Sequence, residues 1–102
     1  MRRRLLVVPA ALFVLTAALA AGTHEVKVEG MKFAPASLTV KRGETVTWRN
    51  ADVVPHTASA AGKFDSGNIA PGQSISKKMD QRGEFDYVCS YHPGMKARLV
   101  VQ

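Results

Sequence analysis

The chain has 102 residues, of which 46% are hydrophobic and 22% charged, so one small domain is expected. Its net charge is +6, but three of these charges come from Arg2, Arg3 and Arg4, which leaves +3 for the remainder. This mild excess lacks the dense basic stripe and interleaved aromatic residues typical of nucleic-acid binding, so a nucleic-acid partner is not expected.

The first segment predicts an export signal. After the basic start, residues 5–19 carry no charge, and Ala18-Leu19-Ala20 has the small-x-small pattern of a signal peptidase site. The apolar run is shorter than the roughly 20 residues that a membrane span needs, which disfavours a retained anchor. We therefore expect a signal peptide over residues 1–20, one domain over residues 21–102, and a periplasmic or otherwise exported protein without membrane insertion.

From His24 onward, apolar and polar residues alternate, which is typical of strands with one buried face. The clearest alternating segments are "EVKVE" (25–29), "SLTV" (37–40), "ETVTWRN" (44–50), "EFDYVC" (84–89) and "ARLVV" (97–101). Turn signals separate them at Arg42-Gly43, Pro71-Gly72 and Arg82-Gly83. Short strands spaced by such turns predict an all-β domain, either a sandwich or a small barrel.

Three other segments are less clear. Residues 55–60 and 73–79 are weaker strand candidates. Residues 61–72 contain three glycines and a proline, which predicts a surface loop.

Cys89 is the only cysteine, so it cannot form a disulfide within the chain. The alternation places it on the same face as Phe85 and Tyr87, with its thiol directed toward the interior at the end of a strand. Such a thiol could pair with a second chain, pack as a small hydrophobic group or hold a metal.

His92 and Met95 follow Cys89 at steps of three residues, on a loop predicted over residues 90–94. A thiolate and a thioether are soft ligands and an imidazole is intermediate, whereas calcium and magnesium require oxygen. A closed zinc site prefers four Cys or His ligands, and Met is a poor substitute. One thiolate, two imidazoles and a weak thioether describe a blue-copper site, which requires a second histidine.

His56 is the candidate for that second histidine. It follows the strand predicted over residues 44–50 and a polar turn, and Pro55 restricts the backbone before it. His24, near the predicted mature start, has no place in this set.

The order of these segments resembles the cupredoxins, the small blue-copper proteins, and most closely the amicyanin and plastocyanin-like branch. "KFAPASLTVKRGETVTWRN" is similar to the family's opening strands, "PHT" to its first ligand segment and "FDSGNIAPGQS" to its connecting loop. "GEFDYVCSYHPGM" is similar to its ligand loop, with the short Cys-x2-His-x2-Met spacing of amicyanin. The resemblance covers roughly residues 24–102 and implies a Greek-key β-sandwich of about seven to eight short strands.

The resemblance also implies a ligand set of one copper ion. His56, Cys89 and His92 would be the strong ligands and Met95 the long axial ligand. Thr57 departs from the family, because many relatives have Asn after the first histidine. That Asn ties the two ligand segments together, and the N–H of the same residue approaches the thiolate.

The family resemblance implies a carrier of single electrons, with the edge of His92 as the exit. Redox protein partners would dock around it, near Pro93, Met95, Met31 and Val54, and we expect a monomer. A protein that binds and delivers copper is the alternative, although delivery proteins usually expose clusters of Met or His. An enzyme with Cys89 as nucleophile is disfavoured, because no oxyanion-hole motif accompanies it.

Overall fold

The computed structural model describes residues 22–102, and the predicted export signal over residues 1–20 lies outside them. No helix in the described part is long and apolar enough to cross a bilayer. The structure contains nine strands: β1 (Thr23–Glu29), β2 (Lys32–Ala34), β3 (Ser37–Val40), β4 (Thr45–Asn50), β5 (Ser59–Ala60), β6 (Phe64–Asp65), β7 (Ser74–Lys78), β8 (Gly83–Cys89) and β9 (His92–Val101).

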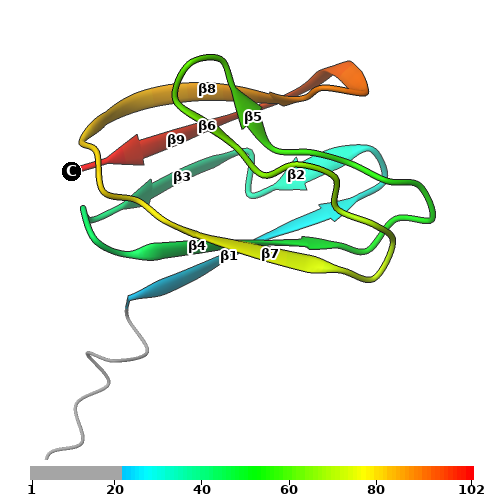
Figure 1. The fold of residues 1–102 in the computed structure, drawn as a ribbon, viewed down its shortest axis with the longest axis horizontal. Coiled ribbons are helices and arrows are strands. Elements are labelled where there is room, and N and C mark those ends of the chain that lie inside the picture. The colour runs from blue at the N-terminus through cyan, green and yellow to red at the C-terminus, as the bar shows by residue number, and fades with distance from the viewer. Residues whose placement is uncertain (1–21) are drawn as a thin grey trace, which may run out of the picture.

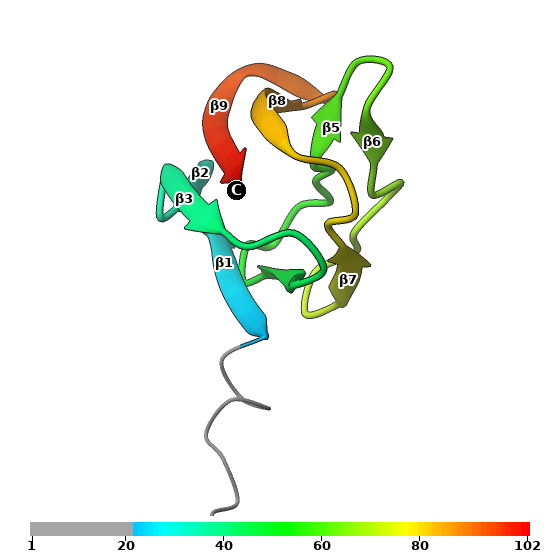
Figure 2. The ribbon, with the colours of Figure 1, turned by 90° about the vertical axis from the view of Figure 1, so that its left-hand side faces the viewer.

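The strands form two sheets that pack face to face. One sheet has the order β2-β1-β4-β7 and the other β3-β9-β8-β5-β6. Figure 1 shows the two layers from the side, and Figure 2 shows them from the end that carries the C-terminus, curving around the core. The predicted all-β sandwich is therefore confirmed.

Alternation along the strands explains which side chains form the core. Val26 and Val28 of β1 and Val46 and Trp48 of β4 point inward from one sheet and are fully buried. From the other sheet, alternate residues of β8 and β9 do the same, namely Phe85, Tyr87, Cys89, Met95, Ala97, Leu99 and Val101. Burial of this apolar surface is the main favourable contribution to folding.

Two details of the strand prediction were wrong. The final strand, predicted to begin near Ala97, begins at His92, because Cys89 pairs with His92 and extends the β8–β9 ladder up to the turn. The segment predicted as a loop over residues 61–72 contains β6, and Ile69 forms a bridge with His56. With these short pairings counted, the described residues hold nine strands where about seven to eight were expected.

A buried hydrogen bond links the two sheets. The indole Nε1–H of Trp48 on β4 donates to the hydroxyl of Tyr87 on β8, at 3.3 Å. The two rings meet edge to face, with centroids 5.8 Å apart. Burial raises the pKa of Tyr87 to about 12, although the hydrogen bond from Trp48 acts in the opposite direction.

The raised pKa of Tyr87 predicts a loss of stability at high pH. An unfolded tyrosine has a pKa of about 10, so the folded state retains the phenol proton more strongly than the unfolded state. This contribution is complete below about pH 10 and is lost as the pH rises through about 12, which amounts to about 2–3 kcal/mol. Urea unfolding of the metal-free protein, followed by Trp48 fluorescence, should show this loss.

The variant Tyr87→Phe has no phenol to ionise and should lack this part of the loss. At neutral pH it should be less stable by about 1–2 kcal/mol, because the Trp48 N–H loses its partner. The matched control is Tyr91→Phe, since Tyr91 is half exposed. An equal alkaline loss in wild type and Tyr87→Phe would contradict the assignment.

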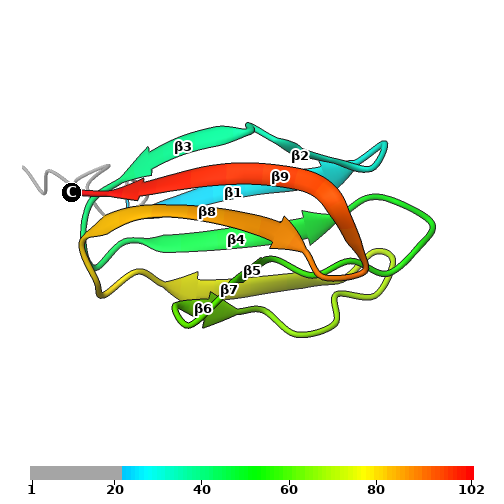
Figure 3. The same cartoon turned by 90° about the horizontal axis from the view of Figure 1, so that it is seen from above.

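Three connections meet at one end of the sandwich. The β1–β2 turn, the β4–β5 connection and the β8–β9 turn all lie at the end opposite the C-terminus (Figures 1 and 3). His56 lies in the second connection, and Cys89 and His92 flank the third. The fold therefore brings the predicted ligand segments together.

Candidate metal centre

Three of the predicted ligands converge on one point. His56 Nδ1 lies 3.6 Å from Cys89 Sγ, and His92 Nδ1 lies 3.7 Å from the same sulfur. The ligand atoms of the three residues all lie within 4.8 Å of one another. Donor atoms that share one ion at about 2.0–2.3 Å are separated by roughly 3–4 Å, so the observed spacing fits a single metal. A thiolate with two imidazoles is a donor set that suits copper.

The β8–β9 turn sets the spacing of Cys89 and His92. Cys89 ends β8, His92 begins β9, and only Ser90 and Tyr91 separate them. The register shifts between Val88 and Cys89, because Val88 pairs with Lys96 whereas Cys89 pairs with His92. Pro93, Gly94 and Met95 of β9 therefore have no partner in this ladder.

Met95 lies on β9, three residues after His92, and is 6% exposed. It packs as part of the core and lines a small hollow of about 230 Å³ together with Met31 and Gly94. The fourth predicted ligand is therefore buried at the same end of the sandwich, next to the turn that carries Cys89 and His92.

His56 is held by backbone pairing with the segment after β6. Its N–H donates to Ile69 O at 3.1 Å, and Ile69 N–H donates to His56 O at 2.7 Å. The side chain is fully buried. This short bridge places the imidazole beside the end of β8.

Asp52 orients the His56 ring. Asp52 Oδ2 lies 2.7 Å from His56 Nε2, and because a carboxylate accepts, Nε2–H donates to it and Nδ1 is the ring nitrogen directed at the Cys89 sulfur. The same carboxylate accepts from the N–H groups of Gly30 and Met31, at 2.7 and 3.0 Å. Burial alone would raise the pKa of Asp52, but the N–H groups of Met31 and Gly30 and the His56 ring together lower it. Such carboxylate–histidine pairs fix the tautomer of metal ligands.

Asn50 shapes the loop that carries Asp52 and His56. It is fully buried at the end of β4. Its amide donates to Val54 O and Ile69 O, each at 2.9 Å, and its Oδ1 accepts the Asp52 N–H at 2.9 Å. The sequence analysis identified neither Asn50 nor Asp52 as a site residue. The available signal was Asn50 at the end of the predicted strand with Asp52 two residues later, since Asn commonly bonds the backbone two residues ahead.

Several hydrogen-bond donors surround the Cys89 thiol. The Thr57 N–H approaches the sulfur at 3.4 Å. Burial alone would raise the pKa of Cys89, but the Thr57 N–H, the two histidine rings and the Tyr91 N–H lower it to about 6. The thiolate is therefore the favoured form at neutral pH, and it is the form that binds metals.

Thr57 also connects the two ligand segments. Its hydroxyl accepts the N–H of Ser90, the residue after Cys89, at 2.8 Å. Thr57, where the sequence departs from the family pattern, thus makes the two contacts expected of the usual Asn. Its N–H points to the thiol, and its side chain bonds the turn between Cys89 and His92.

Exposure differs among the three converging residues. Cys89 and His56 are completely buried, whereas His92 is partly exposed. Of the large apolar residues named near His92, Met31 and Val54 are 40% and 37% exposed, and Val53 and Tyr91 at the same end are 92% and 50% exposed.

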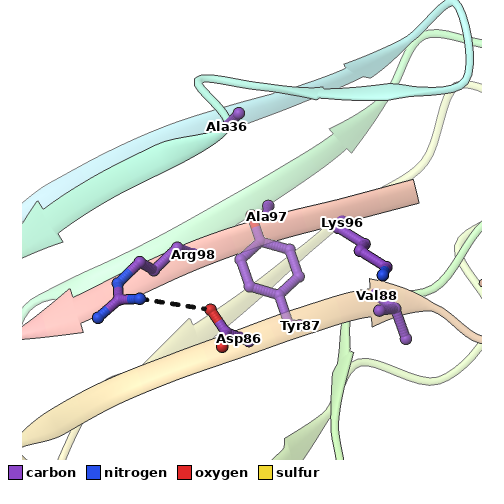
Figure 4. A pocket seen from close by; sticks show the side chains of 7 residues that line it. All are labelled: Ala36, Asp86, Tyr87, Val88, Lys96, Ala97 and Arg98. Carbon is purple, nitrogen blue, oxygen red and sulfur yellow. Dashed lines mark ion pairs between the residues drawn. The ribbon is translucent and has the colours of Figure 1, made fainter. Parts of the chain in front are cut away.

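A separate hollow of about 590 Å³ lies over β8 and β9 (Figure 4). It is lined by Ala36, Asp86, Tyr87, Val88, Lys96, Ala97 and Arg98. Arg98 Nη1 lies 3.8 Å from Asp86 Oδ1 across it. None of the converging residues lines this hollow, so the metal centre is distinct from it.

Comparison with known proteins gives consistent matches. The sequence profile of the family described as "Cupredoxin-like domain" matches residues 4–101. Amicyanin-alpha of Methylorubrum extorquens is 35% identical over 92 residues, covering 80% of this chain and 74% of that protein. Plastocyanin of Scenedesmus fuscus is 40% identical over 85 residues, covering 69% of this chain and 86% of that protein.

Solved structures agree with the sequence matches. A Cu(I) structure of a mutant amicyanin superposes with a TM-score of 0.75 at 32% identity, covering 84% of this chain and 88% of that one. The Cu(I) form of another amicyanin mutant gives a TM-score of 0.74, also at 32% identity, covering 79% of this chain and 83% of that one.

Proposed function

This chain belongs to the cupredoxin-like family, and on that premise we propose that it is a small exported blue-copper protein that carries single electrons between redox partners. The observation that carries the proposal is the convergence of His56, Cys89 and His92 on one point. The enclosure of Cys89 and His56 favours electron transfer over delivery of the metal, because a delivered ion must leave its ligands.

We assign one type 1 copper ion to His56, Cys89, His92 and Met95. When bound, copper supplies a one-electron couple between Cu(I) and Cu(II). The chain's own contribution is to hold the donor atoms in place. Asp52 orients the His56 ring, Asn50 shapes its loop, and Thr57 and Tyr91 direct N–H groups at the sulfur.

We propose the partly exposed His92 as the exit for electrons. Met31, Val53, Val54 and Tyr91 expose apolar surface at the same end, which supports docking of a redox protein there. We further propose that the protein is exported through the signal over residues 1–20 and is a monomer. We propose no enzymatic role and no nucleic-acid partner.

One titration tests the proposed function and separates it from copper delivery. Cu(II) added to the metal-free protein should produce an intense blue absorption that bleaches with ascorbate and returns on oxidation. The cycle is then repeated with a Cu(I) chelator present. An electron carrier should keep its copper through the cycle, whereas loss of the metal on reduction would favour a role in copper delivery. A colourless copper adduct would overturn the assignment of a blue-copper site.

Met95 is tested by its effect on the reduction potential. Met95→Leu should keep the blue colour and raise the potential by about 59 mV or more, a tenfold change in a one-electron equilibrium, because loss of a donor disfavours Cu(II) relative to Cu(I). Spectroelectrochemical titration measures it. Met79→Leu changes a methionine that is equally buried and lies beside Gly43 and Glu44 at the other end of the sandwich, and it should leave the potential unchanged. An unchanged potential in Met95→Leu would remove Met95 from the ligand set.

A further inference from the structure

A chain of hydroxyl groups leads from the metal centre to the surface. Thr57 Oγ1 lies 3.0 Å from Ser59 Oγ, and Ser59 Oγ lies 3.0 Å from Asp65 Oδ1. Ser90 joins the same chain, because its hydroxyl donates to Ser59 Oγ at 3.0 Å. The chain begins at Thr57, which is 4% exposed, and ends at Asp65, which is exposed.

The carboxylate at the end of the chain fixes the direction of each hydrogen bond. An Asp carboxylate accepts and does not donate, so the single hydroxyl proton of Ser59 is directed to Asp65. Ser59 Oγ is then left with acceptor capacity only, so the Thr57 hydroxyl donates to it. The lone pairs of Thr57 Oγ1 therefore remain available for the N–H of Ser90, which they accept at 2.8 Å.

Short strands hold the members of the chain in position. Ser59 lies on β5, where it pairs with Asp65 of β6 on one side and with Val88 of β8 on the other. The Asp65 carboxylate also accepts the Gly67 N–H at 2.9 Å, which restrains its own loop. The three-strand arrangement places the Asp65 carboxylate two hydroxyl groups, those of Ser59 and Thr57, away from the N–H of Ser90.

We propose that Asp65 is a positioning residue for the metal centre, acting through Ser59 and Thr57 to hold the Ser90 N–H and thereby the turn between Cys89 and His92. The hydrogen-bonded hydroxyl groups thus connect the two ligand segments, as the side chain of a single asparagine does in many relatives. Removal of the acceptor at residue 65 frees the Ser59 hydroxyl to rotate. Thr57 then loses its enforced orientation, and the turn is held less firmly.

The first test uses amide hydrogen exchange of the metal-free protein, so it does not depend on the proposed electron-carrier function. Thr57→Val removes the hydroxyl at nearly constant shape and should speed exchange of the Ser90 amide about tenfold, the equivalent of one net hydrogen bond. Asp65→Ala should speed it several-fold, and Asp65→Asn, which keeps an acceptor oxygen, should restore most of the protection. The Leu99 amide, on β9 between β3 and β8, reports opening of the whole fold and should change little.

A double-mutant cycle decides whether the effect passes along the chain. Because the Ser90 hydroxyl also donates directly to Ser59 Oγ, the cycle is run in the Ser90→Ala background, where Asp65→Ala should have no further effect on the amide of residue 90 when Thr57 is already Val. Asp86→Ala is the matched control, because its carboxylate is exposed on β8 and lies toward Arg98. An equal effect of Asp65→Ala in both backgrounds, an equal rise at Leu99, or no effect at all would overturn the proposal.

The second test uses the copper-loaded protein and rests on the proposed function. Asp65→Ala and Asp65→Asn remove the same negative charge, so any difference between their reduction potentials comes from the hydrogen-bond acceptor. We expect the two potentials to differ in the wild-type background and to coincide when Thr57→Val is combined with Ser90→Ala, which removes both routes to the turn. Coincident potentials in the wild-type background, alongside a positive exchange result, would overturn the link to the copper site while leaving the structural tie intact. Failure to bind copper at all would count against the proposed function alone.

Discussion

Replacement of Cys89 by serine should abolish the blue absorption of the copper-loaded protein and weaken copper binding by more than about 100-fold, beyond the 10–100-fold typical of losing an outer partner. Both imidazoles face the Cys89 sulfur, at 3.6 and 3.7 Å. A serine hydroxyl is a harder donor and stays protonated at neutral pH, so it replaces neither the charge nor the softness of the thiolate. Copper titration followed by absorbance, with a competing chelator, measures both effects.

The first control for Cys89→Ser is to check that the variant still folds. The metal-free variant should keep the far-ultraviolet circular dichroism of the wild type, because serine is close in size to the buried cysteine. His24→Gln removes a histidine on β1 that lies 3.2 Å from Glu44 and outside the converging set, and it should keep the colour. Blue absorption that persists in Cys89→Ser would remove the thiolate from the centre.

Asn50→Ala should cause the largest loss of stability among the variants considered, about 3 kcal/mol in the free energy of unfolding. The buried side chain satisfies two carbonyl oxygens and one N–H, of which the Ile69 carbonyl is buried and the other two groups are partly buried, and alanine leaves all three without that partner. Buried polar groups without partners cost about 1–3 kcal/mol each, partly relieved if water enters. Urea unfolding of the metal-free protein measures the loss.

The same variant should weaken copper binding about 10–100-fold, because Asn50 holds both the loop that carries Asp52 and the Ile69 carbonyl beside His56. Asn68→Ala is the matched control, since Asn68 is exposed and accepts one bond, from the Tyr91 hydroxyl at 2.9 Å. Equal effects of the two substitutions would show that the buried network does not support the site.

Hydrophobic alternation was sufficient to predict the main strands and the inward direction of Cys89. Val26, Trp48, Tyr87 and Leu99 are all buried as the period of two requires. Alternation could not predict where β9 begins, because Pro93 and Gly94 favour a loop by composition while the Cys89–His92 pairing overrides it. It gave only a weak candidate over residues 55–60 for β5 and missed β6, since two residues are too few to carry a pattern.

The residues expected to bind the metal were predicted from donor chemistry and family resemblance, and the structure brings His56, Cys89 and His92 together. Their supporting residues depend on long-range contacts that a sequence does not display. Asp52 reaches back to Gly30, and Asp65 reaches Thr57 only through Ser59. Thr57 was identified as a departure from the family, but its bond to Ser90 required the arrangement of β5 beside β8.

The Asp52 carboxylate connects the β1–β2 hairpin to the candidate copper ligand His56. It accepts bonds from Gly30 and Met31 in the first hairpin and from the imidazole of His56. The orientation of that imidazole is therefore thermodynamically linked to docking of the β1–β2 hairpin. With His56 as the proposed ligand, we expect a chain whose first hairpin has not docked to present a poorly oriented imidazole and to bind copper more weakly than the fully folded protein.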